Sequence, residues 1–135
     1  MDLVNSLHIA ASGMKVQSDR LRVVSENIAN ADSAGVRPGD DPYRRKVISF
    51  KNELDRELGV DRVKVHKHGY DESDFVKKYD PVHPAADEEG YVMMPNVNTI
   101  MEMVDMKEAR RAYEANLNVI EVSKGMLQRT VDMLR

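Results

Sequence analysis

The sequence predicts a mainly α fold in which long N- and C-terminal helices pair as an antiparallel coiled coil, with a small irregular β-rich insert between them. Near both ends of the chain, apolar residues recur at alternating steps of four and three, which is the heptad pattern of paired helices. The middle is interrupted by glycine and proline instead. We therefore divide the 135 residues into a discontinuous helical domain, 1–30 plus 96–135, and a loop and β-rich insert, 31–95.

The first predicted helix, Leu3–Asn30, keeps its heptad pattern over about four heptads, which is enough to indicate a coiled coil. A second apolar stripe, Ile9, Val16 and Val23, repeats every seven residues and lies well round the helix from the first. A helix with two separated apolar stripes requires two neighbours to bury them. Asp2 is placed to cap the start of this helix. The predicted seam residues are Leu3, Leu7, Ala10, Met14, Gln17, Leu21, Val24 and Ile28.

The last predicted helix opens within Asn96–Thr99, where Thr99 and Glu102 have the spacing of a capping box, and it runs nearly to Arg135. Flanking apolar residues make its face broader than a two-stranded coiled coil requires, so this helix also needs more than one partner. Asn116 and Gln17 interrupt the two seams and are interpreted as polar residues that set the register. The seam residues of the last helix are Met106, Ala109, Tyr113, Asn116, Ile120, Ser123, Leu127, Thr130 and Leu134.

The segment between the helices carries turn and strand signals. Asn30–Pro42 contains Gly, Pro and Asp in quick succession, which predicts a loop. Lys51–Leu58 fits either a short helix or a strand, and Gly69–Ala86 is predicted to be irregular. The predicted extended segments are Tyr43–Phe50, Val60–His68 and Gly90–Met94.

The composition narrows the class of protein. A net charge of −3 gives no reason to expect nucleic acid as a partner, and the absence of Cys excludes disulfides and thiolate chemistry. With no Trp, 2 Phe and 9 Met, helical seams are a better expectation than a compact aromatic core. No apolar run is long enough to span a bilayer. The N-terminus lacks the features of a secretory signal peptide, so we expect any export to retain it.

Residues that could carry chemistry are sparse. A metal-dependent enzyme would use His66 and His68, which share one face of a predicted strand, with His83 and either Asp80 or Asp87. We favour exposed histidines over a metal site, because no supporting shell is evident. No nucleophile triad, phosphate loop or dinucleotide fingerprint appears. The sequence therefore predicts no catalytic residue, no metal and no cofactor.

Three blocks of the sequence resemble one known family. The end of the first helix, Ser25–Ser33, resembles the N-terminal signature of flagellar rod and hook axial proteins, although Ser33 stands where that family commonly has Thr. The run from Glu102 to Asn116 resembles the C-terminal signature of the same family, and the middle motifs resemble its proximal-rod members. The motif residues are Asn27, Ile28, Ala29, Asn30, Tyr43, Arg44, Arg45, Tyr79, Asp80, Pro81, His83, Pro84, Pro95, Asn96 and Val97.

The resemblance implies a structural subunit of the bacterial flagellar proximal rod, the drive shaft of the basal body, which polymerises with copies of itself and with other rod proteins to transmit torque. It implies export by the flagellar type III apparatus without a cleaved signal peptide, a location in the part of the rod that spans the periplasm, and no small-molecule substrate. Apolar residues outside the helix seam are then expected to meet neighbouring subunits. These predicted inter-subunit residues are Ile9, Val16, Val23, Ala112, Val119, Met126 and Met133.

The residues alone leave one further class of function open. A soluble helical adaptor that binds a single partner through a helix-in-groove contact predicts one apolar stripe on each helix. The second stripe of the first helix, Ile9, Val16 and Val23, argues against that alternative.

Overall fold

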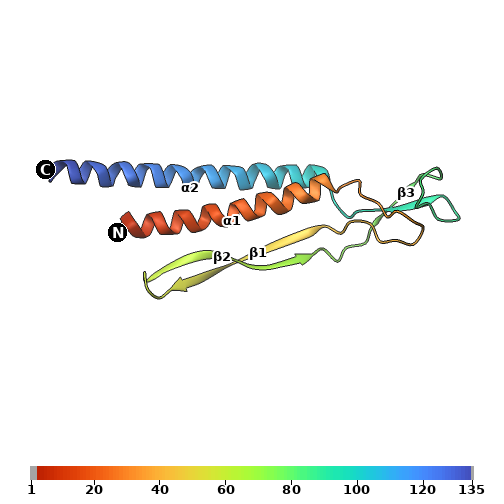
Figure 1. Cartoon of the computed structure of the whole chain (residues 1–135), viewed down its shortest axis with the longest axis horizontal. Coiled ribbons are helices and arrows are strands. Elements are labelled where there is room, and N and C mark those ends of the chain that lie inside the picture. Colours follow the sequence, from red (N-terminus) through yellow and green to blue (C-terminus); the bar gives the residue numbers. More distant parts are fainter. Residues whose placement is uncertain (1–2, 135) are drawn as a thin grey trace. The chain divides into compact units, whose positions relative to one another are not determined.

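The computed structural model describes residues 3–134, so Asp2, expected to cap the first helix, and Arg135 lie outside the described residues. The chain is mainly helical, with β strands between the two long helices (Figure 1). No helix within 3–134 is long and apolar enough to cross a membrane. The elements in chain order are α1 (Leu3–Ala29), β1 (Lys46–Asp55), β2 (Val60–Tyr70), β3 (Val76–Tyr79), β4 (Tyr91–Met94) and α2 (Thr99–Met133).

The four strands form two separate two-stranded sheets, β1–β2 and β3–β4. The chain divides into two compact units, and each unit combines parts of both helices with part of the segment between them. Among the described residues, unit 1 holds 3–21, 48–67 and 107–134. Unit 2 holds Arg22–Val47 and His68–Met106.

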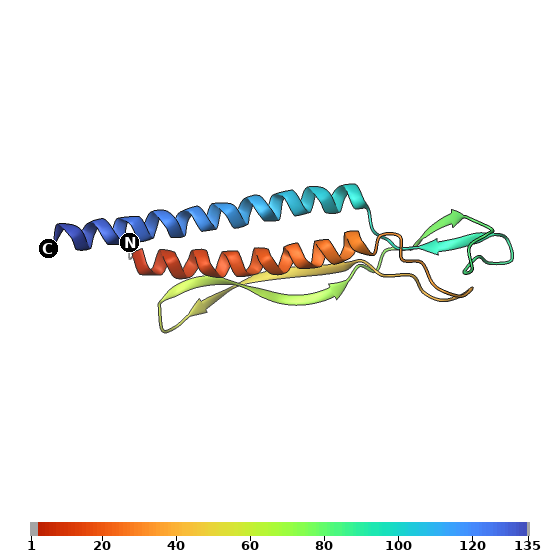
Figure 2. The ribbon, with the colours of Figure 1, turned by 45° about the horizontal axis from the view of Figure 1, so that its top comes forward.

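In unit 1 the two helices are in contact. A Cβ atom built on Gly13 would lie 2.8 Å from Asn116 Nδ2, so the backbone of α1 approaches α2 closely at this point. About two turns further along α1, Arg20 forms an ion pair of 3.7 Å with Glu108. The unit 1 parts of β1 and β2 run beside α1 (Figure 2), and Val16 lines a pocket together with residues of β2.

The turn between β1 and β2 settles the ambiguous segment Lys51–Leu58. β1 continues to Asp55, whose carboxylate accepts hydrogen bonds from the N–H groups of Glu57 and Leu58 and so forms the turn. Gly59 closes this turn with a φ of 65°, a left-handed conformation that favours glycine. The segment is therefore a strand followed by a turn, and not a helix.

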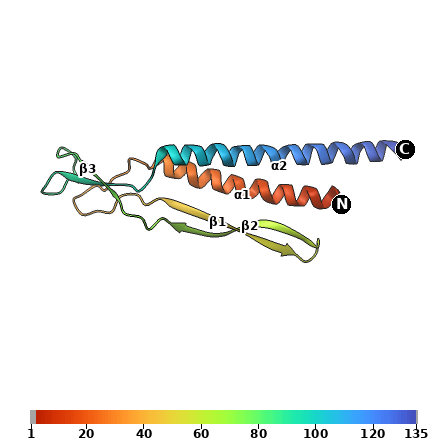
Figure 3. The same cartoon turned by 180° about the vertical axis from the view of Figure 1, so that it is seen from behind.

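Unit 2 contains the last turns of α1, the first turns of α2 and the antiparallel β3–β4 sheet (Figure 3 shows the chain from behind). Tyr79 faces Tyr91 across the strands, and their rings pack edge to face at 5.3 Å between centroids. Gly90 precedes β4 with a φ of 83°. β4 confirms the predicted strand Gly90–Met94, whereas β3 falls in the segment predicted to be irregular.

The helix boundaries confirm the sequence prediction to within a residue or two, but the cap of α2 differs. Asn98, and not Thr99, is the N-cap, because its side-chain oxygen accepts hydrogen bonds from the N–H groups of Ile100 and Met101. Glu102 is thereby released from a capping box and is buried elsewhere. Just after the C-terminal end of α1, the side-chain amide of Asn30 donates to the Glu26 carbonyl at 2.8 Å.

Candidate functional site

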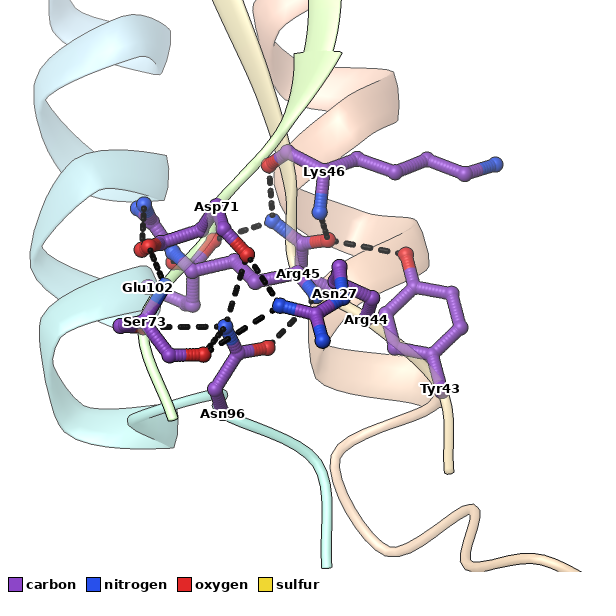
Figure 4. A network of polar contacts seen from close by, with 9 residues as sticks. All are labelled: Asn27, Tyr43, Arg44, Arg45, Lys46, Asp71, Ser73, Asn96 and Glu102. Carbon is purple, nitrogen blue, oxygen red and sulfur yellow. Dashed lines mark hydrogen bonds and ion pairs between the residues drawn. The ribbon is translucent and has the colours of Figure 1, made fainter. Parts of the chain in front are cut away.

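The described part of the chain has one extended set of interconnected polar side chains, all within unit 2 (Figure 4). It joins the last turns of α1, the start of β1, the segment after β2, the strand-to-helix connection and the first turn of α2. We call it the polar network. Its members are Asn27, Tyr43, Arg44, Arg45, Lys46, Asp71, Ser73, Asn96 and Glu102.

Asn27 is the centre of the polar network and is 1% exposed. Its Nδ2 donates to the Lys46 carbonyl at 2.9 Å and to Glu102 Oε2 at 3.0 Å. Its Oδ1 accepts from the Lys46 N–H and from the Tyr43 hydroxyl, both at 2.9 Å. Both amide protons and both oxygen lone pairs of Asn27 are therefore satisfied. Its amide binds the backbone of β1 as a neighbouring strand would, and it connects that backbone to α2 (Figure 4).

Glu102 is also 1% exposed, and its charge is matched inside the unit. Arg45 Nε donates to Glu102 Oε1 at 2.6 Å, and Arg45 Nη1 donates to Asp71 Oδ2 at 3.4 Å. Burial opposes the charge of Arg45, but the hydrogen bond and attraction of Glu102 outweigh it and raise the pKa of the guanidinium. A buried carboxylate is stable here because it has a cation and an amide as donors.

Asn96 and Arg44 fix the segment that follows β2. Asn96 Oδ1 accepts from the Arg45 N–H at 2.8 Å, and its Nδ2 donates to the Asp71 carbonyl at 3.0 Å and to the Ser73 carbonyl at 3.1 Å. Arg44 Nη1 donates to the same two carbonyls, and its guanidinium lies 4.2 Å from the centroid of the Phe75 ring. Five separate stretches of chain are thus held together by named polar contacts.

Electrostatics around the polar network are consistent with its hydrogen bonds. The Ser73 N–H and hydroxyl, followed by Arg45, hold the pKa of Asp71 below its ordinary value. The hydrogen bond from Lys46 Nζ, at 2.8 Å, lowers the pKa of Glu26 and raises that of Lys46. Burial raises the pKa of the Tyr43 hydroxyl, so that group stays neutral and donates to Asn27.

The polar network has the chemistry of a structural junction. Its side chains satisfy one another, and no group of three His, Cys, Asp or Glu residues within 3–134 is arranged to hold a metal ion. His83, considered above as a ligand, accepts a hydrogen bond on Nδ1 from the Ala85 N–H at 3.1 Å.

Motif residues from three distant blocks meet in the polar network. Asn27, Tyr43, Arg44, Arg45 and Asn96 all belong to it. The remaining motif residues lie apart from it. The block around β3 and β4 is held by its own turn, in which the Asp80 N–H donates to the Gly90 carbonyl at 2.9 Å and the His83 N–H donates to the Asp80 carbonyl. The residues of that block and its flanks are Tyr79, Asp80, Pro81, His83, Pro84, Pro95 and Val97, and the residues at the end of α1 are Ile28, Ala29 and Asn30.

Four members of the polar network were not singled out as site residues from the sequence: Lys46, Asp71, Ser73 and Glu102. A signal for Glu102 was present, because the heptad spacing that begins at Met106 extends back by four residues to Glu102. A charged residue at a seam position needs a buried partner. The spacing of Lys46, Asp71 and Ser73 carries no comparable signal.

The predicted seam residues differ in burial. Ala10, Val24, Ala109 and Ser123 are buried, whereas Leu134 lies beyond the end of α2 and is 84% exposed, so it has no seam partner. Gln17 Oε1 is buried without a hydrogen-bond partner among the described residues. The half-buried seam residues are Leu3, Leu7, Met14, Gln17, Leu21, Ile28, Met106, Tyr113, Asn116, Ile120 and Leu127.

The second apolar stripe of α1 differs from the expectation that it would stay free for neighbouring subunits. Val16 and Val23 are 3% and 5% exposed, so other atoms of this chain already cover them, whereas Ile9 is 42% exposed. Val16 lines a pocket with Val63 and Val65 of β2, and Val23 lines a second pocket with residues of β1 and β2. In this conformation Val16 and Val23 offer no surface to a neighbour. On α2, by contrast, Ala112 is half-buried, and Val119, Met126 and Met133 are exposed.

Comparison with known proteins gives the class first. The family profile described as "Flagella basal body rod protein" matches residues 7–36, and the profile "Flagellar basal body rod FlgEFG protein C-terminal" matches residues 88–133. These matches cover the regions that supply Asn27, Asn96 and Glu102 to the polar network. The class is therefore that of flagellar basal-body rod proteins.

Full-length relatives define the particular family. The flagellar basal-body rod protein FlgC of Agrobacterium fabrum is 58% identical over 94% of this chain and 91% of its own length. FlgC of Salmonella typhimurium is 38% identical over 98% of both chains, and FlgC of Bacillus subtilis is 37% identical over 98% of this chain and 99% of its own. The chain belongs to the FlgC family of flagellar basal-body rod proteins, which are structural subunits and not enzymes.

Proposed function

We propose that this rod subunit polymerises with copies of itself and with other axial proteins in the proximal rod, where it transmits torque. The observation that carries the proposal is an apolar stripe along α2 that the chain leaves exposed. Val119, Val122, Met126 and Met133 are 45%, 57%, 51% and 79% exposed, and their spacing places them on one side of the helix. We call this face the outer stripe, and it consists of Ala115, Val119, Val122, Met126, Arg129 and Met133.

A row of exposed apolar side chains more than four helical turns long is typical of a surface that meets other proteins. In the proposed rod, neighbouring subunits would cover the outer stripe, together with Ile9 of α1. The same contact would bury the rest of Ala112, which is half-buried at the edge of the outer stripe. Of the predicted inter-subunit residues, the proposal therefore retains the exposed ones, Ile9, Val119, Met126 and Met133.

We further propose that 1–30 and 96–135 pair as an antiparallel coiled coil and form the inner layer of the shaft, with 31–95 as a smaller outer part. Two contacts within unit 1 support the antiparallel direction, since Gly13 lies against Asn116 while Arg20 pairs with Glu108. Residue numbers rise along α1 as they fall along α2. In such a shaft, the polar network would carry load between the helices and the outer part.

We also propose that the flagellar type III apparatus exports the chain with its N-terminal helix retained, into the part of the rod that spans the periplasm. The burial of Ala10, Val16 and Val24 supports retention, because these residues of α1 belong to the folded subunit. Mass spectrometry of the subunit from purified basal bodies tests this proposal. A mature chain that begins after residue 10 would overturn it.

The assembly proposal is tested with Met126→Asp in flagellated cells that lack their own copy of the gene. We expect this chain to be made at normal levels but to be absent from purified basal bodies, and the cells to be non-motile. Gln128→Asp is the matched control, because Gln128 is exposed on the same stretch of α2 but lies off the outer stripe. Normal incorporation of Met126→Asp would refute the role of the outer stripe.

A further inference from the structure

The β3–β4 sheet presents a second exposed face, apolar apart from Lys77, on a different unit from the outer stripe. The register pairs Tyr79 with Tyr91 and Lys77 with Met93, so these four side chains lie on one face of the sheet. Tyr79 is 64% exposed, Tyr91 40% and Met93 39%. On the opposite face Val92 is 1% exposed, whereas Val76 is 57% exposed. We call the exposed side the tyrosine face.

Acidic side chains border the tyrosine face. Asp87, Glu88 and Glu89 are exposed and lie just before β4, with only Gly90 between Glu89 and the strand. Unit 2 as a whole has 7 Lys and Arg against 13 Asp and Glu, a net charge of −6. Among the described residues, unit 1 has 12 Lys and Arg against 9 Asp and Glu, a net charge of +3. The chain is therefore polarised, and opposite units of two copies attract each other.

We propose that the tyrosine face of one subunit docks on the outer stripe of α2 of a second copy. This inference rests on the proposed function and names the complementary surface. The apolar side chains of Val119, Val122 and Met126 match the rings of Tyr79 and Tyr91. Arg129 is the charged member of the outer stripe, and it matches the carboxylates that border the tyrosine face.

Polymer geometry favours this contact over the pairing of two outer stripes. When two identical surfaces pair, they form a closed dimer. When two different surfaces pair, each dimer still has one free surface of each kind, so further subunits can add and form a helical polymer. Pairing of two outer stripes would also bring Arg129 of both copies into one interface and leave both acidic borders unmatched. A contact between the tyrosine face and the outer stripe therefore matches opposite charges and allows open-ended assembly.

Cysteine cross-linking tests the contact, because the chain has no Cys of its own. Chains with Met93→Cys and chains with Met126→Cys, carrying different tags, are expressed together in flagellated cells that lack their own copy. We expect a disulfide-linked dimer that contains both tags in the basal-body fraction after mild oxidation. The matched control replaces Met93→Cys by Val36→Cys, since Val36 is 77% exposed in unit 2 but lies outside β3 and β4.

Each outcome has a definite meaning. A mixed dimer several-fold more abundant than in the control supports the contact. Dimers formed mainly between two Met126→Cys chains would show that outer stripes pair with each other and would overturn it. Cysteine chains that enter basal bodies without mixed cross-linking would overturn this inference while the proposed function stands. Native chains that are absent from basal bodies would overturn both.

Charge reversal provides an independent measurement. Chains with Glu88→Lys and Glu89→Lys, or with Arg129→Glu, should each enter basal bodies several-fold less than the native chain. Asp87 is left unchanged, because its carboxylate accepts hydrogen bonds from the N–H groups of Glu89 and Tyr91. Co-expression of the two variants should restore incorporation. The lysines introduced by Glu88→Lys and Glu89→Lys then meet the glutamate introduced by Arg129→Glu, so the charges are again opposite. Failure of the mixture to exceed either variant alone would contradict the proposal.

Discussion

Asn27 Nδ2 lies 3.0 Å from Glu102 Oε2, and this buried hydrogen bond joins the last turns of α1 to the first turn of α2. Both residues are 1% exposed, so water cannot replace either partner without a rearrangement. The same asparagine binds the backbone of β1 through Lys46, and the same glutamate pairs with Arg45. Through these bonds the two residues connect three elements that are far apart in sequence: α1, β1 and α2.

Replacing Glu102 by Ala should destabilise the chain strongly. The substitution leaves the guanidinium of Arg45 and the amide of Asn27 with an unmatched donor each, and breaking a buried ion pair by removing one partner costs about 3–5 kcal/mol. We expect Asn27→Ala to cost about 2–3 kcal/mol, because it orphans the Lys46 backbone groups. The measurement is the free energy of unfolding from urea titration.

Glu114→Ala is the control for Glu102→Ala. Glu114 forms an i,i+4 ion pair with Arg110 on the same helix, but its side chain is 61% exposed. Exposed pairs contribute little, so the control should change the free energy of unfolding by less than about 0.5 kcal/mol. Equal effects at Glu102 and Glu114 would show that the polar network adds no stability.

The terminal helices could be predicted from sequence because their apolar spacing persists over many turns. Periodicity shows that a residue is buried but not what buries it. Val16 and Val23 illustrate this limit, since their spacing predicts contact with neighbouring subunits, whereas residues of this chain cover them. The long β1–β2 hairpin was not recognised as that partner, because half of β1 has no clear alternation.

The polar network was harder to predict for a different reason. A polar residue near the start of a helix lies in the same local sequence whether its side chain caps the helix or binds another element. The spacing of Thr99 and Glu102 predicts a capping box, but Asn98 caps the helix. β3 was missed because all four of its residues are exposed, which removes the alternation that indicates a strand.

Gly13→Ala should weaken the contact between the helices. The new Cβ atom would lie 2.8 Å from Asn116 Nδ2 and 3.1 Å from its Cγ, so that side chain or the helix must move. Alanine favours a helix over glycine by about 1 kcal/mol, but we expect the clash to outweigh this gain. Adding Asn116→Ala should make room and restore stability. A double-mutant cycle of thermal unfolding measures the coupling.

Gly125→Ala separates the effect of the clash from the effect of helix propensity. Nothing lies within 4 Å of a Cβ atom at Gly125, so only the preference of alanine for the helix remains. We expect a stabilisation of about 0.5–1 kcal/mol. If Gly13→Ala stabilises the chain as much as Gly125→Ala does, the close approach at Asn116 does not constrain the helices.

Acidification should destabilise the folded chain. Hydrogen bonds from Ser73 lower the pKa of Asp71 below 3.8, and Lys46 lowers the pKa of Glu26 below 4.5. Groups with a lower pKa in the folded state give their full stabilisation above the unfolded pKa and lose it as the pH falls through the folded pKa. The free energy of unfolding should therefore be flat above about pH 5.5 and fall below about pH 4.5.

Asp71→Asn tests the origin of this pH dependence. The asparagine cannot ionise, so this variant should be less stable than the native chain at pH 7. It should also lose less stability between roughly pH 5 and pH 2, where carboxylates titrate. Glu121→Gln, an exposed site on α2, is the control and should leave the slope unchanged. An identical acid slope in Asp71→Asn and the native chain would exclude Asp71 as a contributor.

The two ends of α1 should differ in hydrogen exchange when the subunit is a monomer. Arg22–Ala29 includes Val23, Val24 and Asn27, which are 5%, 3% and 1% exposed, so opening this end breaks the polar network. Leu3–Ile9 is half-buried or exposed throughout, and a short helical segment without packing is marginal in water. We expect protected amides at Arg22–Ala29 and fast exchange at Leu3–Ile9, with the difference lost in assembled rods. Uniform protection along α1 of the monomer would instead mean that the helix needs no neighbours.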